Sequence, residues 1–156
     1  MNEGENKTPD FLALYDRYQK LKPGQQAEIK RVVNPGDLIE IPAFYQVLQN
    51  NKAHKGIQRL LYCLPMIKHQ DNGDSLGRAL AKADINEKRL FMVIRSQEPN
   101  DLIQLRRLLK QADKPNVDWI KMANDLWWWD HPSQLSKRKT LEDFFYFQNT
   151  KTKASA

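Results

Sequence analysis

Apolar residues recur along this chain at intervals of three and four positions, and no stretch shows the sustained two-residue alternation of a half-buried strand. The segment 101–112 is typical, because its apolar residues share one face of a helical wheel: Leu102, Leu105, Leu108, Leu109 and Ala112. Leucine occurs 18 times, whereas valine and threonine together occur 9 times, a mixture that favours helices over strands. The sequence therefore predicts an all-α protein.

Proline, glycine and capping residues divide this pattern into about eight to nine helices. We expect Thr8 to cap the first helix, with Pro9 in its first turn, and Asn86 to cap the helix that follows it. Pro65 is expected to kink a longer helix. The predicted helices cover residues 11–21, 25–33, 43–49, 55–68, 75–82, 87–96, 101–112, 117–129 and 133–148.

The polar loop His69–Asp74 is the best internal boundary, because it is rich in turn-forming residues. We therefore expect two small packed helical bundles, over residues 9–74 and 75–149. Residues 1–8 are predicted to be a flexible N-terminus and residues 150–156 a frayed tail. A chain of 156 residues can bury about 68–70% of its unfolded surface, so it needs no metal or disulfide to fold.

Several functional classes find no support in the sequence. No apolar run approaches the roughly 18 residues of a membrane span, and the N-terminus has no signal-peptide core. A single cysteine, Cys63, lies on the apolar side of a predicted helix, and His54, His69 and His131 are too far apart to form a metal-ligand pair. We therefore predict a soluble, cytoplasmic protein that is not an enzyme, with no cofactor, metal or small-molecule substrate.

The net charge of +6 is unevenly placed. Residues 1–74 hold 10 Lys and Arg against 9 Asp and Glu, whereas residues 75–156 hold 15 against 10. On the helical wheel, Arg106, Arg107 and Lys110 lie away from the leucine face, without acidic residues at the positions that would neutralise them. Such a basic stripe favours a polyanionic partner such as a nucleic acid, and the alternative is a solvated basic face.

The three consecutive tryptophans at 127–129 cannot all be core residues. Trp119, Ala123, Leu126 and Trp127 share one side of the predicted helix, and Trp128 falls roughly opposite. Trp128 is therefore expected to face the neighbouring bundle, another subunit or an unstacked base.

Nine short blocks occur in one order through nearly the whole chain: 29–32, 41–45, 69–71, 75–80, 85–89, 104–109, 118–119, 128–129 and 141–144. In these blocks the sequence resembles the CasB family, the small subunits of the type I-E Cascade complex. Cascade is an RNA-guided CRISPR surveillance assembly of bacteria. The segment 75–109 carries the most specific part of this resemblance.

The resemblance implies an all-helical, non-catalytic subunit that occurs as two copies lying head to tail, contacts the other Cascade subunits and serves antiviral defence. It also implies that the subunit stabilises the R-loop by keeping the displaced, single-stranded DNA from re-annealing. The family's binding arginines fall on Arg31, Arg95 and Arg107, and Lys52 takes a position where arginine is typical. Glu98 stands where a further basic residue would be expected.

Charge patterning and resemblance together give one set of candidate nucleic-acid-binding residues: Lys30, Arg31, Lys52, Arg59, Arg78, Lys88, Arg95, Arg106, Arg107 and Lys110. Two alternative functions stay open at this point. One is a free-standing DNA-binding regulator of the helix-turn-helix type, although the sequence has no compact helix–glycine turn–helix pair. The other is an assembly protein whose basic surface contacts only proteins.

Overall fold

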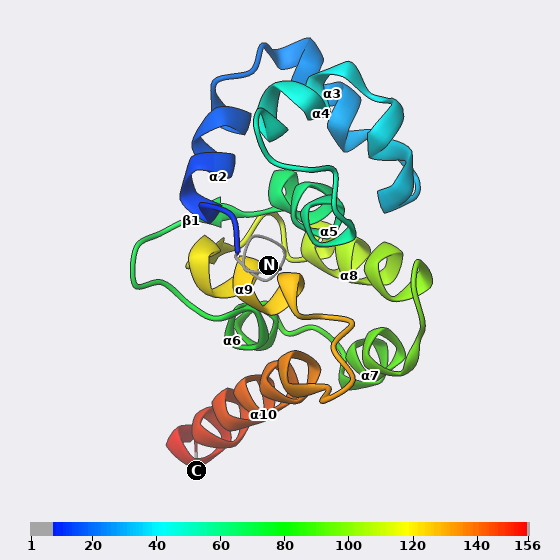
Figure 1. Cartoon of the computed structure of the whole chain (residues 1–156). Coiled ribbons are helices and arrows are strands. Elements are labelled where there is room, and N and C mark those ends of the chain that lie inside the picture. Colours follow the sequence, from blue (N-terminus) through cyan, green and yellow to red (C-terminus); the bar gives the residue numbers. More distant parts are fainter. Residues whose placement is uncertain (1–7, 156) are drawn as a thin grey trace.

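Helices dominate the computed structural model of this protein, which describes residues 8–155 and the side chains of residues 8–151 (Figure 1). The N-terminal elements are α2 (Phe11–Gln19), α3 (Pro23–Lys30), the 3₁₀ helix η1 (Pro35–Glu40), α4 (Pro42–Leu48), α5 (Lys55–Cys63) and the 3₁₀ turn η2 (Leu64–Met66). The C-terminal elements are α6 (Leu76–Lys82), α7 (Glu87–Arg95), α8 (Asn100–Gln111), α9 (Trp119–Trp127) and α10 (Leu135–Ser155). The all-α prediction is confirmed.

Capping residues explain where several of these helices begin. The Asn86 side chain accepts a hydrogen bond from the Lys88 amide at 2.8 Å, as expected for the cap of α7. The first helix differs from the prediction, because its cap is Asp10, which accepts from the Ala13 amide at 3.0 Å, rather than Thr8. The first helix was expected to end just before Pro23, but α2 ends at Gln19 and Pro23 is the first residue of α3. Proline is tolerated there because an N–H at the first helical position has no intrahelical partner.

Two short strands are an addition to the predicted fold. Strand β1 (Lys68–His69) pairs in parallel with β2 (Asn116–Val117). The predicted helix 55–68 is therefore shorter, because the chain passes from α5 into the 3₁₀ turn at Pro65 and then extends. Strands of two residues carry no readable alternation, so the sequence could not reveal them.

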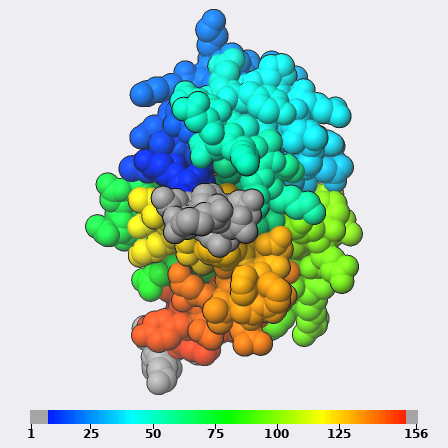
Figure 2. All heavy atoms as spheres, viewed as in Figure 1, coloured from blue at the N-terminus to red at the C-terminus, as the bar shows by residue number. Residues whose placement is uncertain are grey.

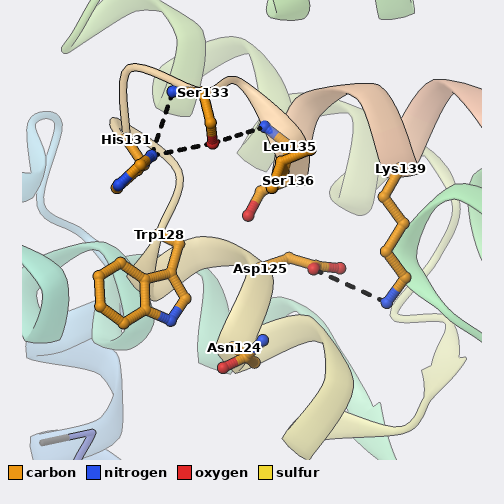
Figure 3. Close-up of a pocket in the computed structure, with 8 residues that line it drawn as sticks. All are labelled: Asn124, Asp125, Trp128, His131, Ser133, Leu135, Ser136 and Lys139. Atoms are coloured by element: carbon orange, nitrogen blue, oxygen red, sulfur yellow. Dashed lines mark hydrogen bonds and ion pairs between the residues drawn. The ribbon is translucent and has the colours of Figure 1, made fainter.

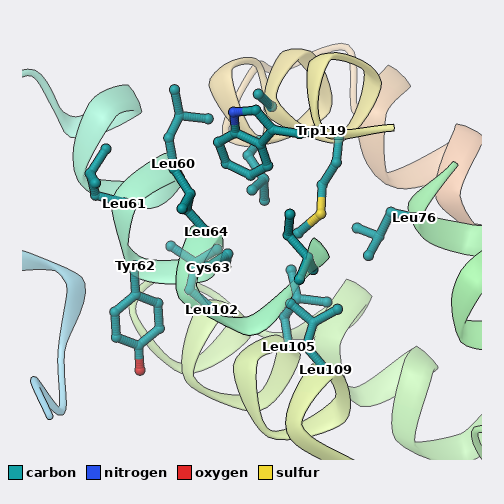
Figure 4. Close-up of a cluster of buried hydrophobic side chains, with 14 of the residues drawn as sticks. Leu60, Leu61, Tyr62, Cys63, Leu64, Leu76, Leu102, Leu105, Leu109 and Trp119 are labelled. Carbon is teal, nitrogen blue, oxygen red and sulfur yellow. The ribbon is translucent and has the colours of Figure 1, made fainter. Parts of the chain in front are cut away.

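Part of the hydrophobic core is shown in Figure 4, where leucines of α5, η2, α6 and α8 gather with Trp119 of α9. Trp119 is fully buried and its indole N–H donates to the Phe11 carbonyl at 2.9 Å, which ties α9 to α2. The Cys63 thiol is also fully buried, and desolvation raises its pKa to about 12. This confirms the expectation that Cys63 lies on an apolar face, and at neutral pH its thiol stays protonated.

The predicted division at residue 74 stays a prediction. In the space-filling view, the N-terminal segments occupy one end of the molecule and α10 the other (Figure 2). However, α9 packs against both α2 and α5, and one hydrophobic cluster includes residues from both predicted bundles. Helix α10 extends to Ser155, and the fraying expected for residues 150–156 stays a prediction. Residues 1–7 of the predicted flexible N-terminus lie outside the described residues.

Candidate nucleic-acid interface

A hollow of about 220 Å³ lies between the end of α3 and the exposed side of α8. We call it the basic hollow, and its lining residues are Lys30, Val32, Val33, Tyr62, Met66, Ile103, Arg106, Arg107 and Lys110. Lys30, Arg107 and Lys110 are exposed, and no acidic side chain is among the lining residues. The structure therefore brings together cations that are more than 70 residues apart in the sequence, with no counter-charge lining the hollow.

Apolar side chains form part of the basic hollow; the helical wheel places Ile103 among the basic residues, whereas Val33 and Met66 were not predicted. Val33 is 67% exposed and lies there beside Met66 and Ile103. The sequence offers only a valine before the turn-forming pair Asn34-Pro35. That does not predict a binding surface, because a single apolar residue at the surface is ordinary in any protein.

The prediction that Arg106 lies on an exposed stripe is wrong. Its side chain is buried, and its guanidinium donates to the backbone carbonyls of Val32 and Lys30 at 2.6 and 2.5 Å. The guanidinium also lies 4.3 Å from the centre of the Tyr62 ring. Arg106 therefore links α8 to the backbone carbonyls at the C-terminal end of α3. It is not a candidate nucleic-acid-binding residue.

Arg59 is a second correction. Its residue is 2% exposed, and its guanidinium donates to the carbonyls of Leu126 and Trp127 at 2.7 and 2.8 Å. It also pairs with Glu98 at 3.0 Å and Asp130 at 3.1 Å. Four of its five N–H donors are engaged and the residue is buried, so this guanidinium is not accessible to a nucleic acid. The ion pair with Arg59 also explains why position 98 is acidic, where a further basic residue was expected.

The remaining candidates are exposed but are not part of the basic hollow. Arg78 pairs with Asp74 at 2.9 Å, a carboxylate that it shares with Lys82. Lys88 and Arg95 are on α7, and the Arg95 guanidinium lies 4.9 Å from the centre of the Phe91 ring. Arg31 is the C-cap residue of α3, beside Lys30, and Lys52 follows α4.

A second cavity, of about 440 Å³, lies between α9 and the start of α10 (Figure 3). We call it the tryptophan pocket, and its lining residues are Asn124, Asp125, Trp128, His131, Ser133, Leu135, Ser136 and Lys139. Trp128 is 38% exposed, whereas Trp119 and Trp129 are fully buried, so the expectation that Trp128 points away from the helix's core face is confirmed. His131 meets the Trp128 ring edge-on, with ring centres 6.0 Å apart.

The carboxylate of Asp125 is the unusual group in the tryptophan pocket. The residue is 4% exposed, and burial raises its pKa to about 6, a shift that Lys139 opposes and Asp143 supports. Lys139 reaches one carboxylate oxygen only at 3.8 Å. Within the described residues, no hydrogen bond reaches either oxygen of this carboxylate.

We expect Asp125→Asn to stabilise the protein by about 2 kcal/mol at pH 7.5 and to have little effect at pH 4. The raised pKa means that the folded state holds an extra proton between about pH 4 and 6, so the stability that Asp125 contributes falls as the pH rises through this window. Urea unfolding of both proteins at the two pH values measures the difference. Asp16→Asn, at an exposed carboxylate, is the matched control. Equal effects of Asp125→Asn at both pH values would contradict the expectation.

Comparison with known proteins identifies the family. The model of the CRISPR-associated protein Cse2 family matches residues 25–145. The chain belongs to the Cse2 family. The resemblance in the sequence to small subunits of this kind is thereby confirmed.

Individual CasB proteins are similar to this chain in sequence and in structure. The Cascade subunit CasB of Escherichia coli K12 is 40% identical over an alignment of 156 positions, which covers 90% of this chain and 95% of that protein. In the crystal structure of E. coli Cascade bound to a PAM-containing double-stranded DNA target, a chain matches with a TM-score of 0.83 and 42% identity. That match covers 92% of this chain and 99% of the other. The M. ruber CasB structure, at 14% identity, matches with a TM-score of 0.71 over 96% of this chain and 100% of its own, and shows that the fold is shared.

Membership of the Cse2 family does not favour the helix-turn-helix regulator. Among the described residues, no helix is long and apolar enough to cross a membrane. The same part of the chain holds no group of three His, Cys, Asp or Glu residues placed to bind a metal ion.

Proposed function

We propose that this protein is the non-catalytic small subunit of a type I-E Cascade complex and that it holds displaced single-stranded DNA of the R-loop along the basic hollow. The observation that carries the proposal is the convergence of Lys30, Arg107 and Lys110 around one hollow without an acidic lining residue. The E. coli relatives are named as Cascade components, and one was crystallised in a DNA-bound complex.

Physical chemistry supports this use of the surface. In RNA-guided recognition, base pairing with the guide reads the sequence, so a small subunit has no need to discriminate bases. It needs cations that follow the sugar–phosphate backbone and apolar surface against which bases can lie. The basic hollow has three exposed cations, and Val33 and Ile103 supply apolar surface beside them.

Opening a DNA duplex against an RNA guide is close to balanced in free energy, so a few phosphate contacts made only in the open state can decide the outcome. We propose that Arg31, Lys52, Lys88 and Arg95, all exposed, extend the contacts beyond the hollow. A second copy of this chain would lengthen the path, and other Cascade subunits would hold both copies in place. The proposed role is antiviral defence in the cytoplasm.

The test is Arg107→Ala/Lys110→Ala in the assembled complex. We expect R-loops to dissociate about tenfold or more faster, because two phosphate contacts are lost, and the dependence of log affinity on log salt to become shallower by about 1.4. Arg138→Ala/Lys20→Ala removes the same charge at exposed positions outside the hollow and is the matched control. R-loop lifetimes at several salt concentrations give both quantities.

Each alternative predicts a different result. Unchanged R-loop lifetime and salt dependence in an assembled Arg107→Ala/Lys110→Ala complex would refute the phosphate-binding role. Loss of complex assembly with normal DNA binding would instead indicate a pure assembly protein. A preference of the isolated chain for one duplex sequence in a gel shift would indicate a regulator.

A further inference from the structure

We propose that the tryptophan pocket receives an arginine side chain of a neighbouring protein subunit, with Asp125 as its carboxylate partner and Trp128 as the wall on which the guanidinium stacks. This site is separate from the basic hollow, and the proposal needs no DNA. It concerns how the protein docks onto other proteins.

The first reason is the hydrogen-bonding state of Asp125. Buried carboxylates normally accept several hydrogen bonds, because an unsatisfied buried charge is costly. Here the described residues offer the Asp125 carboxylate only the Lys139 ammonium, at 3.8 Å, beyond hydrogen-bonding distance. Figure 3 shows the carboxylate at the side of the pocket, between Trp128 and Lys139. Among the described residues, Arg106 Nε is the only fully buried polar side-chain atom without a partner, so the Asp125 oxygens face the pocket and are open to a donor that enters it.

The second reason is the match to a guanidinium. This group is planar, always charged, and presents paired N–H donors that fit the two oxygens of a carboxylate. Its flat face also stacks on indole rings, and tryptophan is the best aromatic partner for a cation. Asp125 and Trp128 lie three residues apart near the end of α9, so both line the same cavity. Phosphates and carboxylates would be repelled by Asp125, so the charge selects a cation.

The third reason is the rim of the pocket, which favours a protein over a free small cation. Leu135, at the start of α10, is 66% exposed and lines the same cavity. A buried charge pair beside an aromatic ring and an exposed leucine is typical of the centre of a protein–protein interface, where arginine is enriched. Lys139 is half-exposed and distant enough to move aside when a better donor arrives.

A titration of the full-length protein with N-acetyl-arginine amide tests the site. The indole N–H signal of Trp128 in a nitrogen–proton NMR spectrum, assigned with Trp128→Phe, reports binding. We expect a saturable shift in the millimolar range at pH 7.5, and no such shift with N-acetyl-citrulline amide, which has the same shape without the charge. Equal shifts with both compounds would overturn the proposal.

Variants of opposite expected effect sharpen this test. Asp125→Asn keeps the side-chain shape and should weaken binding at least tenfold, whereas Lys139→Ala removes a competing cation and should strengthen it about two- to fivefold. Arg107→Ala/Lys110→Ala, in the basic hollow, should leave the titration unchanged, so failure here is distinguishable from failure of the proposed DNA-binding function. Undiminished binding to Asp125→Asn would refute the assignment, as would a Trp128 response to a thymidine dinucleotide in place of the arginine compound.

Assembly gives a second measurement in the complete complex. We expect Asp125→Asn to lower the yield of this protein in purified Cascade about tenfold in competition with the unmodified chain, and Asp16→Asn, an exposed control, to have no effect. Equal incorporation of Asp125→Asn and the unmodified protein would contradict the docking role.

Discussion

Replacing Arg59 with methionine is expected to destabilise the folded protein by about 2–3 kcal/mol, because it removes a buried guanidinium that holds two helix-end carbonyls and two partly exposed carboxylates. The Arg59 guanidinium donates to the carbonyls of Leu126 and Trp127 at the end of α9 and pairs with Glu98 and Asp130. Without it, the Trp127 carbonyl loses the donor that Arg59 supplies, the Leu126 carbonyl keeps backbone donors such as the Trp129 amide at 3.3 Å, and two carboxylates lose their cation. Methionine fills part of the volume, so the loss reflects polar contacts more than a cavity.

Urea unfolding monitored by tryptophan fluorescence measures the effect on stability, since Arg59 contacts the backbone beside the tryptophan cluster. Arg138→Met, at an exposed position on α10, is the matched control and should change stability by less than about 0.5 kcal/mol. A loss of less than about 1 kcal/mol for Arg59→Met would show that its four contacts contribute little net free energy.

Local sequence signals were sufficient for most of the helices. Leucine spacing placed α8 within one residue of its observed ends, and Asn86 marked the start of α7. The parallel pair β1–β2 could not be predicted, because its two strands are nearly 50 residues apart in the sequence and are paired only in the tertiary structure. A two-residue strand is a consequence of tertiary structure, so it leaves no pattern in the sequence.

The basic residues show where sequence reasoning stops. A helical wheel separates the leucine face of α8 from the opposite side, but it cannot show that the end of α3 covers part of that second side. Arg106 therefore became buried against the Val32 and Lys30 carbonyls, whereas Arg107, one position later, stayed exposed. Trp128 was placed correctly because one side of α9 faces solvent, as the wheel assumes. In the sequence, Asp125 could lie near Asp130 and His131, but a helix-end cap explained these residues at least as well, and only the structure shows that Asp125 lines a pocket.

The replacement Gly77→Ala is expected to destabilise the protein by about 3 kcal/mol and to loosen α10. Gly77 lies where α6 crosses α10, and an added Cβ would meet the Thr140 carbonyl closer than the 3.0 Å that real Cβ atoms keep. The Asp143 Cβ and the Phe144 amide nitrogen would both lie 3.0 Å away. Because these are mostly backbone atoms of one helix, no side-chain rotation relieves the clash, and the two helices must separate.

Gly24→Ala is the matched control, because Gly24 lies within α3 and a Cβ there meets nothing within 4 Å. Alanine is the better helix former by about 0.5–1 kcal/mol, so this substitution should stabilise the protein slightly. Hydrogen exchange adds the location of the change: amides of α10 near Phe144 should lose protection in Gly77→Ala and keep it in Gly24→Ala. If Gly77→Ala were neutral and α10 stayed protected, the close crossing of α6 and α10 would be wrong. A loss confined to α10 would show that this helix can separate from an otherwise intact core.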